Sequence, residues 1–138
     1  MKIEKAIYVA QAKATSGHGA HVSAIGGDLN IKLDTPKAMG GTGTNPEQLF
    51  AAGYSACFLA ALAFVANSEK ITIPPEATIE AHVGIGKIPN GFGLEAELKI
   101  ALPGMESTQA KALIEKAHIL CLFSNATRNN VEVTLTLL

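Results

Sequence analysis

Apolar and polar residues alternate along two neighbouring stretches in the middle of the chain. Residues 79–85 and 94–102 each place an apolar side chain at every second position. A period of two is typical of strands that bury one face and leave the other in water. The segment 89–93 between them is rich in Gly, Pro and Asn, so the pattern predicts a long antiparallel hairpin.

Shorter stretches predict further strands on both sides of this hairpin. Residues 2–15 carry a weak strand pattern, and residues 21–25 and 29–34 flank a Gly-Gly-Asp turn that predicts a second hairpin. Residues 131–137 alternate again and predict a final strand.

Two segments instead predict helices. The longer begins at Pro46, which suits the first helical position, with Thr44 or Asn45 as the cap. No charged residue occurs in residues 48–66. Residues 106–120 carry one apolar stripe at helical spacing and predict the second helix. The resulting order β-β-β-α-β-β-α-β favours an α+β fold with mainly antiparallel sheets and two main helices.

The uncharged segment is long enough to span a membrane, but other features favour a buried central helix. It is rich in Ala and Gly and includes Gln48, Tyr54 and Ser55, and strand patterns lie on both sides of it. A helix that is apolar all round must be covered all round. The rest of a 138-residue chain supplies limited cover, so we expect a second copy of the chain to provide the remainder.

Composition limits the classes of function. The chain has 138 residues, of which 48% are hydrophobic and 17% charged, which fits one folded domain over residues 1–138. The formal net charge of -1 leaves no positive surplus for a nucleic acid or an anionic membrane. No secretory signal follows Met1, so we expect a cytoplasmic protein.

The two cysteines, Cys57 and Cys121, are the first candidates for chemistry. They lie 64 positions apart, one in each predicted helix, and both are expected to point inward. They cannot form a four-cysteine zinc site, and the four histidines show no metal-ligand spacing, so neither a metal nor a cofactor is predicted. Two interpretations stay open at this point: a pair of buried apolar side chains, or a redox pair.

A reactive thiolate at Cys57 would need a positive charge nearby, because the residue lies far from the start of its helix. Glu47 could orient that charge, or could simply be an acidic residue that favours the first helical turn. Glu47 and Cys57 are about 15 Å apart along one straight helix, so a second chain or a reversing element must bring them together if they share a site. The candidate cations are His18, His21, Lys37 and Arg128.

Two segments resemble a known family. The run TNPEQLFAAGYSACF at 44–58 is similar to the signature of organic hydroperoxide resistance (Ohr) proteins, a branch of the OsmC/Ohr superfamily. Residues 117–128, with Ala-His before Cys121 and SNATR after it, resemble the second signature of that family. The resemblance extends over essentially the whole chain.

The resemblance implies a thiol peroxidase that reduces organic hydroperoxides, including those of fatty acids. Cys57 would be the peroxidatic thiolate that becomes a sulfenic acid, and Cys121 the resolving thiol that forms a disulfide with it. Glu47 would hold the catalytic cation, and Phe50, Phe58 and Leu59 could form an apolar pocket. The resemblance also implies an intertwined homodimer, active sites at its interface, and reduction by a dithiol such as a dihydrolipoyl group on a partner protein.

The chain departs from the family pattern in three places. The glycine-rich segment after the first strand has His18 where the family usually has Arg. The loop before Thr44 is a few residues short, and Leu122 and Phe123 stand where Pro and Tyr are typical. We therefore expect His18 to take the role of the arginine with lower efficiency, with Arg128 or a lysine as the rival.

Two other functions remain open. The chain could be a non-catalytic relative that binds a hydrophobic ligand or senses oxidants, or an OsmC-type member with a broader peroxide preference.

Overall fold

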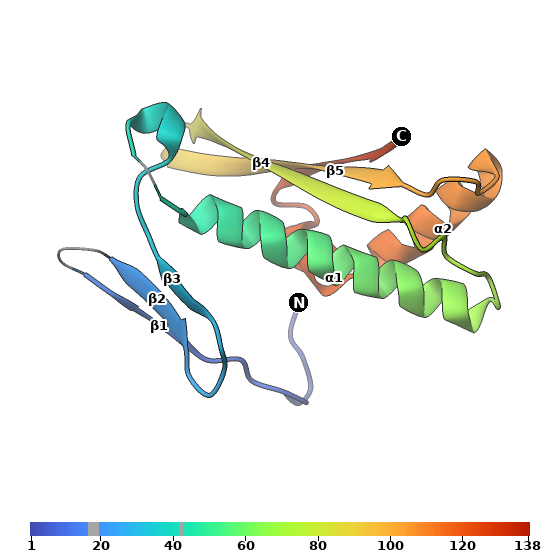
Figure 1. The fold of residues 1–138 in the computed structure, drawn as a ribbon, viewed down its shortest axis with the longest axis horizontal. Coiled ribbons are helices and arrows are strands. Elements are labelled where there is room, and N and C mark those ends of the chain that lie inside the picture. Colours follow the sequence, from blue (N-terminus) through green and yellow to red (C-terminus); the bar gives the residue numbers. More distant parts are fainter. Residues whose placement is uncertain (17–19, 42) are drawn as a thin grey trace. The chain divides into compact units, whose positions relative to one another are not determined.

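The computed structural model describes residues 1–16, 20–41 and 43–138. These residues divide into two compact units, Met1–Pro46 and Glu47–Leu138. Each unit contains its own three-stranded sheet (Figure 1).

The first unit is a small antiparallel sheet in the order β1-β2-β3. Its strands are β1 (Ala12–Thr15), β2 (His21–Ala24) and β3 (Asn30–Lys32). Gly26 lies in the turn between β2 and β3 with a φ of 78°, a conformation that favours glycine over residues with a side chain. The hairpin expected over residues 21–34 is therefore present.

Two features of the first unit differ from the sequence prediction. The strand expected over residues 2–15 is confined to β1, and Ile7 and Tyr8 before it are exposed. The loop expected before Thr44 contains a short 3-10 helix, η1 (Lys37–Met39), which ends at Gly40. A strand needs a paired neighbour as well as apolar side chains, and local pattern alone does not report the pairing.

The long helix of the second unit is α1 (Pro46–Ser68). It begins at the proline that the sequence indicates, and it ends where Lys70 adopts a left-handed conformation with φ 58°. One side of α1 is buried. The buried residues on this side are Tyr54, Phe58, Ala61, Leu62, Val65 and Ala66. The expectation of a buried central helix is thus met on one side of α1 within the single chain.

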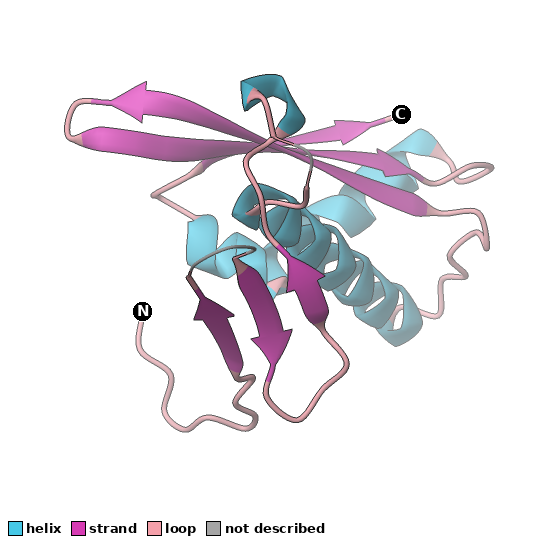
Figure 2. Cartoon of the chain, turned by 60° about the vertical axis from the view of Figure 1, so that its left-hand side comes forward, coloured by secondary structure: helices cyan, strands magenta, loops and turns pink. Residues whose placement is uncertain are grey.

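The second sheet supplies the other half of this core. It consists of β4 (Thr78–Ile88), β5 (Gly91–Ala101) and β6 (Glu132–Leu137), in that order across the sheet. The buried apolar side chains of β5, among them the fully buried Leu98 and Ile100, belong to the same core cluster as the buried side of α1. Both views show α1 running along this sheet (Figures 1 and 2).

The sheet is not antiparallel throughout. β4 pairs with β5 antiparallel, as the alternating pattern predicts, whereas β5 pairs with β6 parallel. Parallel neighbours need a long connection, and here α2 (Ser107–Leu120) and α3 (Leu122–Thr127) form that crossover. The α+β class with mainly antiparallel pairing is confirmed, and the β5–β6 pair is a parallel exception.

The crossover holds one element that the sequence pattern does not reveal. The buried stripe of α2 is the predicted one: Ala110, Leu113, Ile114 and Ala117. The chain then bends at Cys121, whose φ of -60° and ψ of 125° interrupt the helix, and α3 begins directly after it. Cys121 therefore lies at a corner between two helices, where a single helix reaching this residue was expected.

Candidate functional site

The structure brings the two cysteines together. Cys57, half-buried on α1, and Cys121, buried at the corner between α2 and α3, have their Sγ atoms 3.5 Å apart. Both are free thiols. Since a disulfide has an S–S length of about 2.05 Å, a small shift would suffice for bond formation.

The surroundings of Cys57 oppose its ionisation. Burial is the largest cause that raises the pKa of this thiol, and the adjacent Cys121 raises it further. The backbone amides of Phe123 and Leu122 act in the opposite sense, because an N–H that donates to the sulfur favours the thiolate. The net direction is upward, so the described neighbours of Cys57 do not by themselves provide a reactive thiolate.

Phe50 and Tyr54 of α1 form an aromatic cluster with Phe123 of α3. The Phe123 ring lies 5.7 Å from the Tyr54 ring and 6.0 Å from the Phe50 ring, centroid to centroid. Gly53 lets Phe123 approach α1 closely, because a Cβ at this position would stand 3.1 Å from two carbons of the ring. The contact fixes the start of α3 against the helix that carries Cys57.

Phe50, Phe58 and Leu59, which were expected to form an apolar pocket, lie in different surroundings. Phe58 is fully buried in the core and Leu59 is exposed, so these consecutive residues lie on different sides of α1. Phe50 instead belongs to the aromatic cluster with Tyr54 and Phe123.

A series of hydrogen-bonded side chains links α1 to the segment around Cys121. The Tyr54 hydroxyl is 3.0 Å from Ser124 Oγ, and Ser124 Oγ is 2.9 Å from His118 Nδ1. Thr127 Oγ1 lies 3.3 Å from the Tyr54 hydroxyl and donates to the Phe123 carbonyl. Sequence reasoning did not single out this chain of contacts, because it depends on the bend at Cys121 and on α3.

Glu47 and the candidate cations are the partners that the sequence predicts for Cys57. Glu47 is half-buried in the first turn of α1, ten positions before Cys57 on the same helix. His18 lies outside the described residues, and His21 and Lys37 belong to the unit Met1–Pro46. The roles of Glu47 and His18 therefore stay predictions.

Arg128, the only arginine, holds the end of α2. Its guanidinium donates to the His118 carbonyl at 2.8 Å, and also to Asn125 Oδ1. These bonds give Arg128 a structural task at the corner that contains Cys121.

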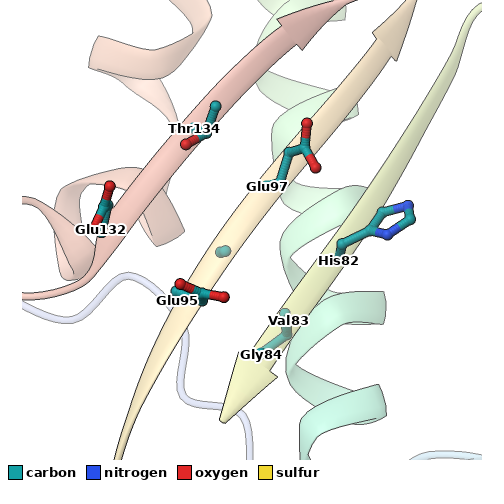
Figure 3. Close-up of a pocket in the computed structure, with 8 residues that line it drawn as sticks. His82, Val83, Gly84, Glu95, Glu97, Glu132 and Thr134 are labelled. Carbon is teal, nitrogen blue, oxygen red and sulfur yellow. The ribbon is translucent and has the colours of Figure 1, made fainter. Parts of the chain in front are cut away.

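A separate hollow of about 520 Å³ lies over the polar face of the second sheet (Figure 3). Polar side chains from all three strands point into it, including His82, Glu95, Glu97, Glu132 and Thr134. Glu95 faces Glu132 across one strand pair, and His82 faces Glu97 across the other. Among the residues that the structure describes, no group of three or more His, Cys, Asp or Glu is arranged to hold a metal ion.

The chain is similar to proteins of one family. Residues 39–136 match the family described as OsmC-like protein. The organic hydroperoxide resistance protein of Xanthomonas axonopodis pv. citri is 50% identical over 137 residues, which are 97% of this chain and 96% of the relative.

Solved structures agree with this match. A crystal structure of an organic hydroperoxide resistance protein from Elizabethkingia anophelis has 50% identity and a TM-score of 0.90, covering 96% of this chain and 97% of the other. That of OhrB from Bacillus subtilis has 39% identity and a TM-score of 0.86, covering 96% and 100%.

Proposed function

The chain belongs to the OsmC-like protein family, in its organic hydroperoxide resistance branch, and from this premise we propose that it is a thiol peroxidase that reduces organic hydroperoxides to alcohols. The observation that carries the proposal is the pair of free thiols 3.5 Å apart in the second unit. Detoxification of organic hydroperoxides, including those of fatty acids, is the role that follows.

The reaction takes place in two steps. The Cys57 thiolate attacks the terminal peroxide oxygen, the O–O bond breaks, and the alkoxide takes up a proton and leaves as the alcohol. Cys57 is then a sulfenic acid. The Cys121 sulfur attacks the Cys57 sulfur, the S–O bond breaks, and the hydroxyl leaves with a proton as water. The result is a Cys57–Cys121 disulfide.

A dithiol must return the disulfide to two thiols. A dihydrolipoyl group on a partner protein fits this task, since one such group supplies both electrons through thiol–disulfide exchange. We place the cycle in the cytoplasm, where thiols are kept reduced.

Glu47 and a cation complete the proposed site. The raised pKa of Cys57 means that a positive charge is needed to favour the thiolate. His18 is proposed as that charge and Glu47 as the residue that orients it. Because Glu47 and Cys57 lie ten residues apart on α1, we propose that Glu47 reaches the site of a second copy of the chain.

The homodimer is supported by α1. Its uncovered side carries an apolar stripe of Ala52, Ala56, Leu59, Ala60, Ala63 and Phe64, all exposed in the single chain. A second α1 packed on this stripe would bury it. We also propose that both units form one domain over residues 1–138.

Peroxide titration of the reduced protein tests the proposal. Mixing with cumene hydroperoxide in a stopped-flow instrument should consume two thiols per peroxide, and mass spectrometry should find a Cys57–Cys121 disulfide. Cys57→Ser should abolish the reaction, whereas Cys121→Ser should stop at the sulfenic acid. Thiols that stay inert to the peroxide would overturn the assignment.

One observation favours a second candidate function. The upward pKa of Cys57 fits a non-catalytic relative that binds a hydrophobic ligand or senses oxidants slowly. Rates with hydrogen peroxide and with a bulky organic peroxide separate the remaining alternative, an OsmC-type enzyme with a broad preference. If the bulky organic peroxide reacts much faster than hydrogen peroxide, the Ohr assignment is supported. If the two peroxides react equally fast, the OsmC-type enzyme with a broad preference is supported.

A further inference from the structure

We propose that Tyr54, Ser124 and His118 form a hydrogen-bonded clasp that positions Cys121 for its attack on oxidised Cys57. This inference rests on the proposed function, because it concerns the second step of that reaction. The three residues would be positioning residues, acting on the sulfur atoms only through the backbone that they hold.

The clasp closes the corner in which Cys121 lies. His118 is three positions before Cys121 and Ser124 is three positions after it. The 2.9 Å contact between His118 Nδ1 and Ser124 Oγ therefore spans the bend from α2 to α3. The backbone adds two bonds, from Cys121 N–H to the Ala117 carbonyl and from Asn125 N–H to the Cys121 carbonyl. The bend is thus tied on both sides of the thiol.

The same clasp ties the corner to α1. Tyr54 lies three positions, about one helical turn, before Cys57, and its hydroxyl contacts Ser124 Oγ at 3.0 Å. Tyr54 and Ser124 are both fully buried. A buried hydroxyl that loses its partner is costly, so the contact resists opening. The position of Cys121 relative to Cys57 is therefore set by a bond between α1, which carries Cys57, and α3, which begins directly after Cys121.

The protons of the clasp can be arranged without a conflict. Burial, followed by the charge of Arg128, lowers the pKa of His118, which favours the neutral imidazole. A neutral ring can accept at Nδ1, so Ser124 can donate to His118 while Tyr54 donates to Ser124. The Thr127 hydroxyl donates to backbone carbonyls, so its oxygen stays available as a second acceptor for Tyr54 at 3.3 Å.

Loosening the clasp should act mainly on disulfide formation. The Sγ atoms start at 3.5 Å and must reach bonding distance, a step whose rate depends on how well the two groups are held. A slower second step leaves the Cys57 sulfenic acid exposed to further peroxide, which oxidises it to the sulfinic acid. The fraction of sulfinic acid formed per turnover therefore reports on the clasp.

The test compares clasp variants with matched controls in the full chain. Tyr54→Phe and Ser124→Ala each remove one hydroxyl, and the controls Tyr8→Phe and Ser68→Ala make the same changes outside the site. With cumene hydroperoxide, both clasp variants should form the disulfide about ten- to a hundredfold more slowly and accumulate more sulfinic acid. The controls should match the wild type in both measurements.

A conservative pair at the half-buried His118 separates positioning from general destabilisation. His118→Asn keeps a hydrogen-bonding group near the place of Nδ1, and His118→Leu does not. Asn should restore much of the disulfide rate that Leu loses, at similar melting temperatures.

The outcomes distinguish the two proposals. Wild-type protein that forms a disulfide, together with clasp variants that form it equally fast, would overturn the clasp alone. Equal rates for His118→Asn and His118→Leu would do the same. Wild-type protein that consumes no peroxide would overturn the proposed function, and the clasp with it.

Discussion

At Cys57, the side chain on which the proposed chemistry depends, neighbouring groups shift the pKa of the thiol in opposite directions. Burial and the neighbouring Cys121 raise the pKa of the thiol, and the amides of Phe123 and Leu122 only partly oppose them. A positive charge close to the sulfur would shift this balance toward the thiolate. The identity of the cation is therefore the residue-scale question with the largest effect on rate.

Replacing His18 with Arg tests that question. Arginine stays charged at all working pH values and can hold a carboxylate with two hydrogen bonds, whereas histidine loses its charge near pH 6.5. We expect His18→Arg to raise the rate constant for reduction of an organic hydroperoxide, and to raise it most above neutral pH. Stopped-flow measurements across a pH series provide the check.

The control is His82→Arg, which adds the same group on the exposed face of β4, where His82 hydrogen-bonds Glu80. It should leave the rate unchanged. If His18→Arg gives no gain, His18 does not hold the catalytic position. Arg128→Ala then tests the rival. If Arg128 supplies the charge, the reaction of Cys57 with peroxide should slow, whereas loss of its bonds to the His118 carbonyl and Asn125 alone should affect the later step at Cys121.

At this scale the sequence predicts the two cysteines well and their surroundings poorly. The run around Cys57 and the segment around Cys121 carry the family resemblance, and the structure places both sulfurs together. The amides of Leu122 and Phe123 could not be predicted as neighbours of Cys57. They reach it only because the chain turns at Cys121, and no local signal marks that turn.

At the scale of elements, the start of α2 shows how one side chain fixes a helix. The Glu106 carboxylate accepts hydrogen bonds from the backbone N–H groups of Thr108 at 2.9 Å and Gln109 at 3.0 Å. These donors have no partner within the helix, so the side chain caps it. The same bonds lower the pKa of Glu106 below its ordinary value of 4.5.

Glu106→Ala should lower the melting temperature, and the loss should depend on pH. Because the pKa of Glu106 is lower in the folded chain than in the unfolded one, its stabilisation is complete above about pH 4.5 and is lost as pH falls through the lowered value. The difference in melting temperature between wild type and variant should therefore be largest near neutral pH and should decrease in acid. Thermal unfolding followed by circular dichroism measures it.

Glu115→Ala serves as the control, since Glu115 is exposed on the same helix. Its effect should be smaller and should not show this narrowing. If Glu106→Ala lowers the melting temperature as much in acid as near neutral pH, the assignment of Glu106 as the cap is wrong.

Elements with strong local signals are those that the sequence predicts. Pro46 and the uncharged run give α1, and strict alternation gives β4 and β5. The parallel pairing of β5 with β6 was not predicted, because it is set by the crossover through α2 and α3 rather than by either strand. The weak pattern before β1 led to a strand that is too long, because the ladder with β2 in the described part of the chain includes only Ala12–Thr15.

At the scale of the whole molecule, α1 raises the question of what covers its second side. By its length of 23 residues and its apolar composition it could cross a membrane. The core helix of a soluble protein passes the same test. Here the buried side of α1 belongs to a core shared with β5, which a lipid-embedded helix would not need. The exposed stripe therefore favours a protein partner, and a second α1 presents a matching apolar surface.

Phe64→Glu tests this arrangement, because the Phe64 side chain is 66% exposed in the single chain and is the largest side chain of the stripe, at its C-terminal end. Wild-type protein should sediment at twice the chain mass of 14.3 kDa, and the variant at the single mass, because an unpaired carboxylate buried between two apolar helices is strongly unfavourable. Gln109→Glu adds the same charge on the exposed start of α2 and should leave the dimer intact. If Glu47 reaches the partner's Cys57, the Phe64→Glu monomer should also lose peroxide reduction while its thiols remain titratable. A wild type that sediments at the single mass would contradict the dimer, and a monomeric variant with full activity would place Glu47 outside the site.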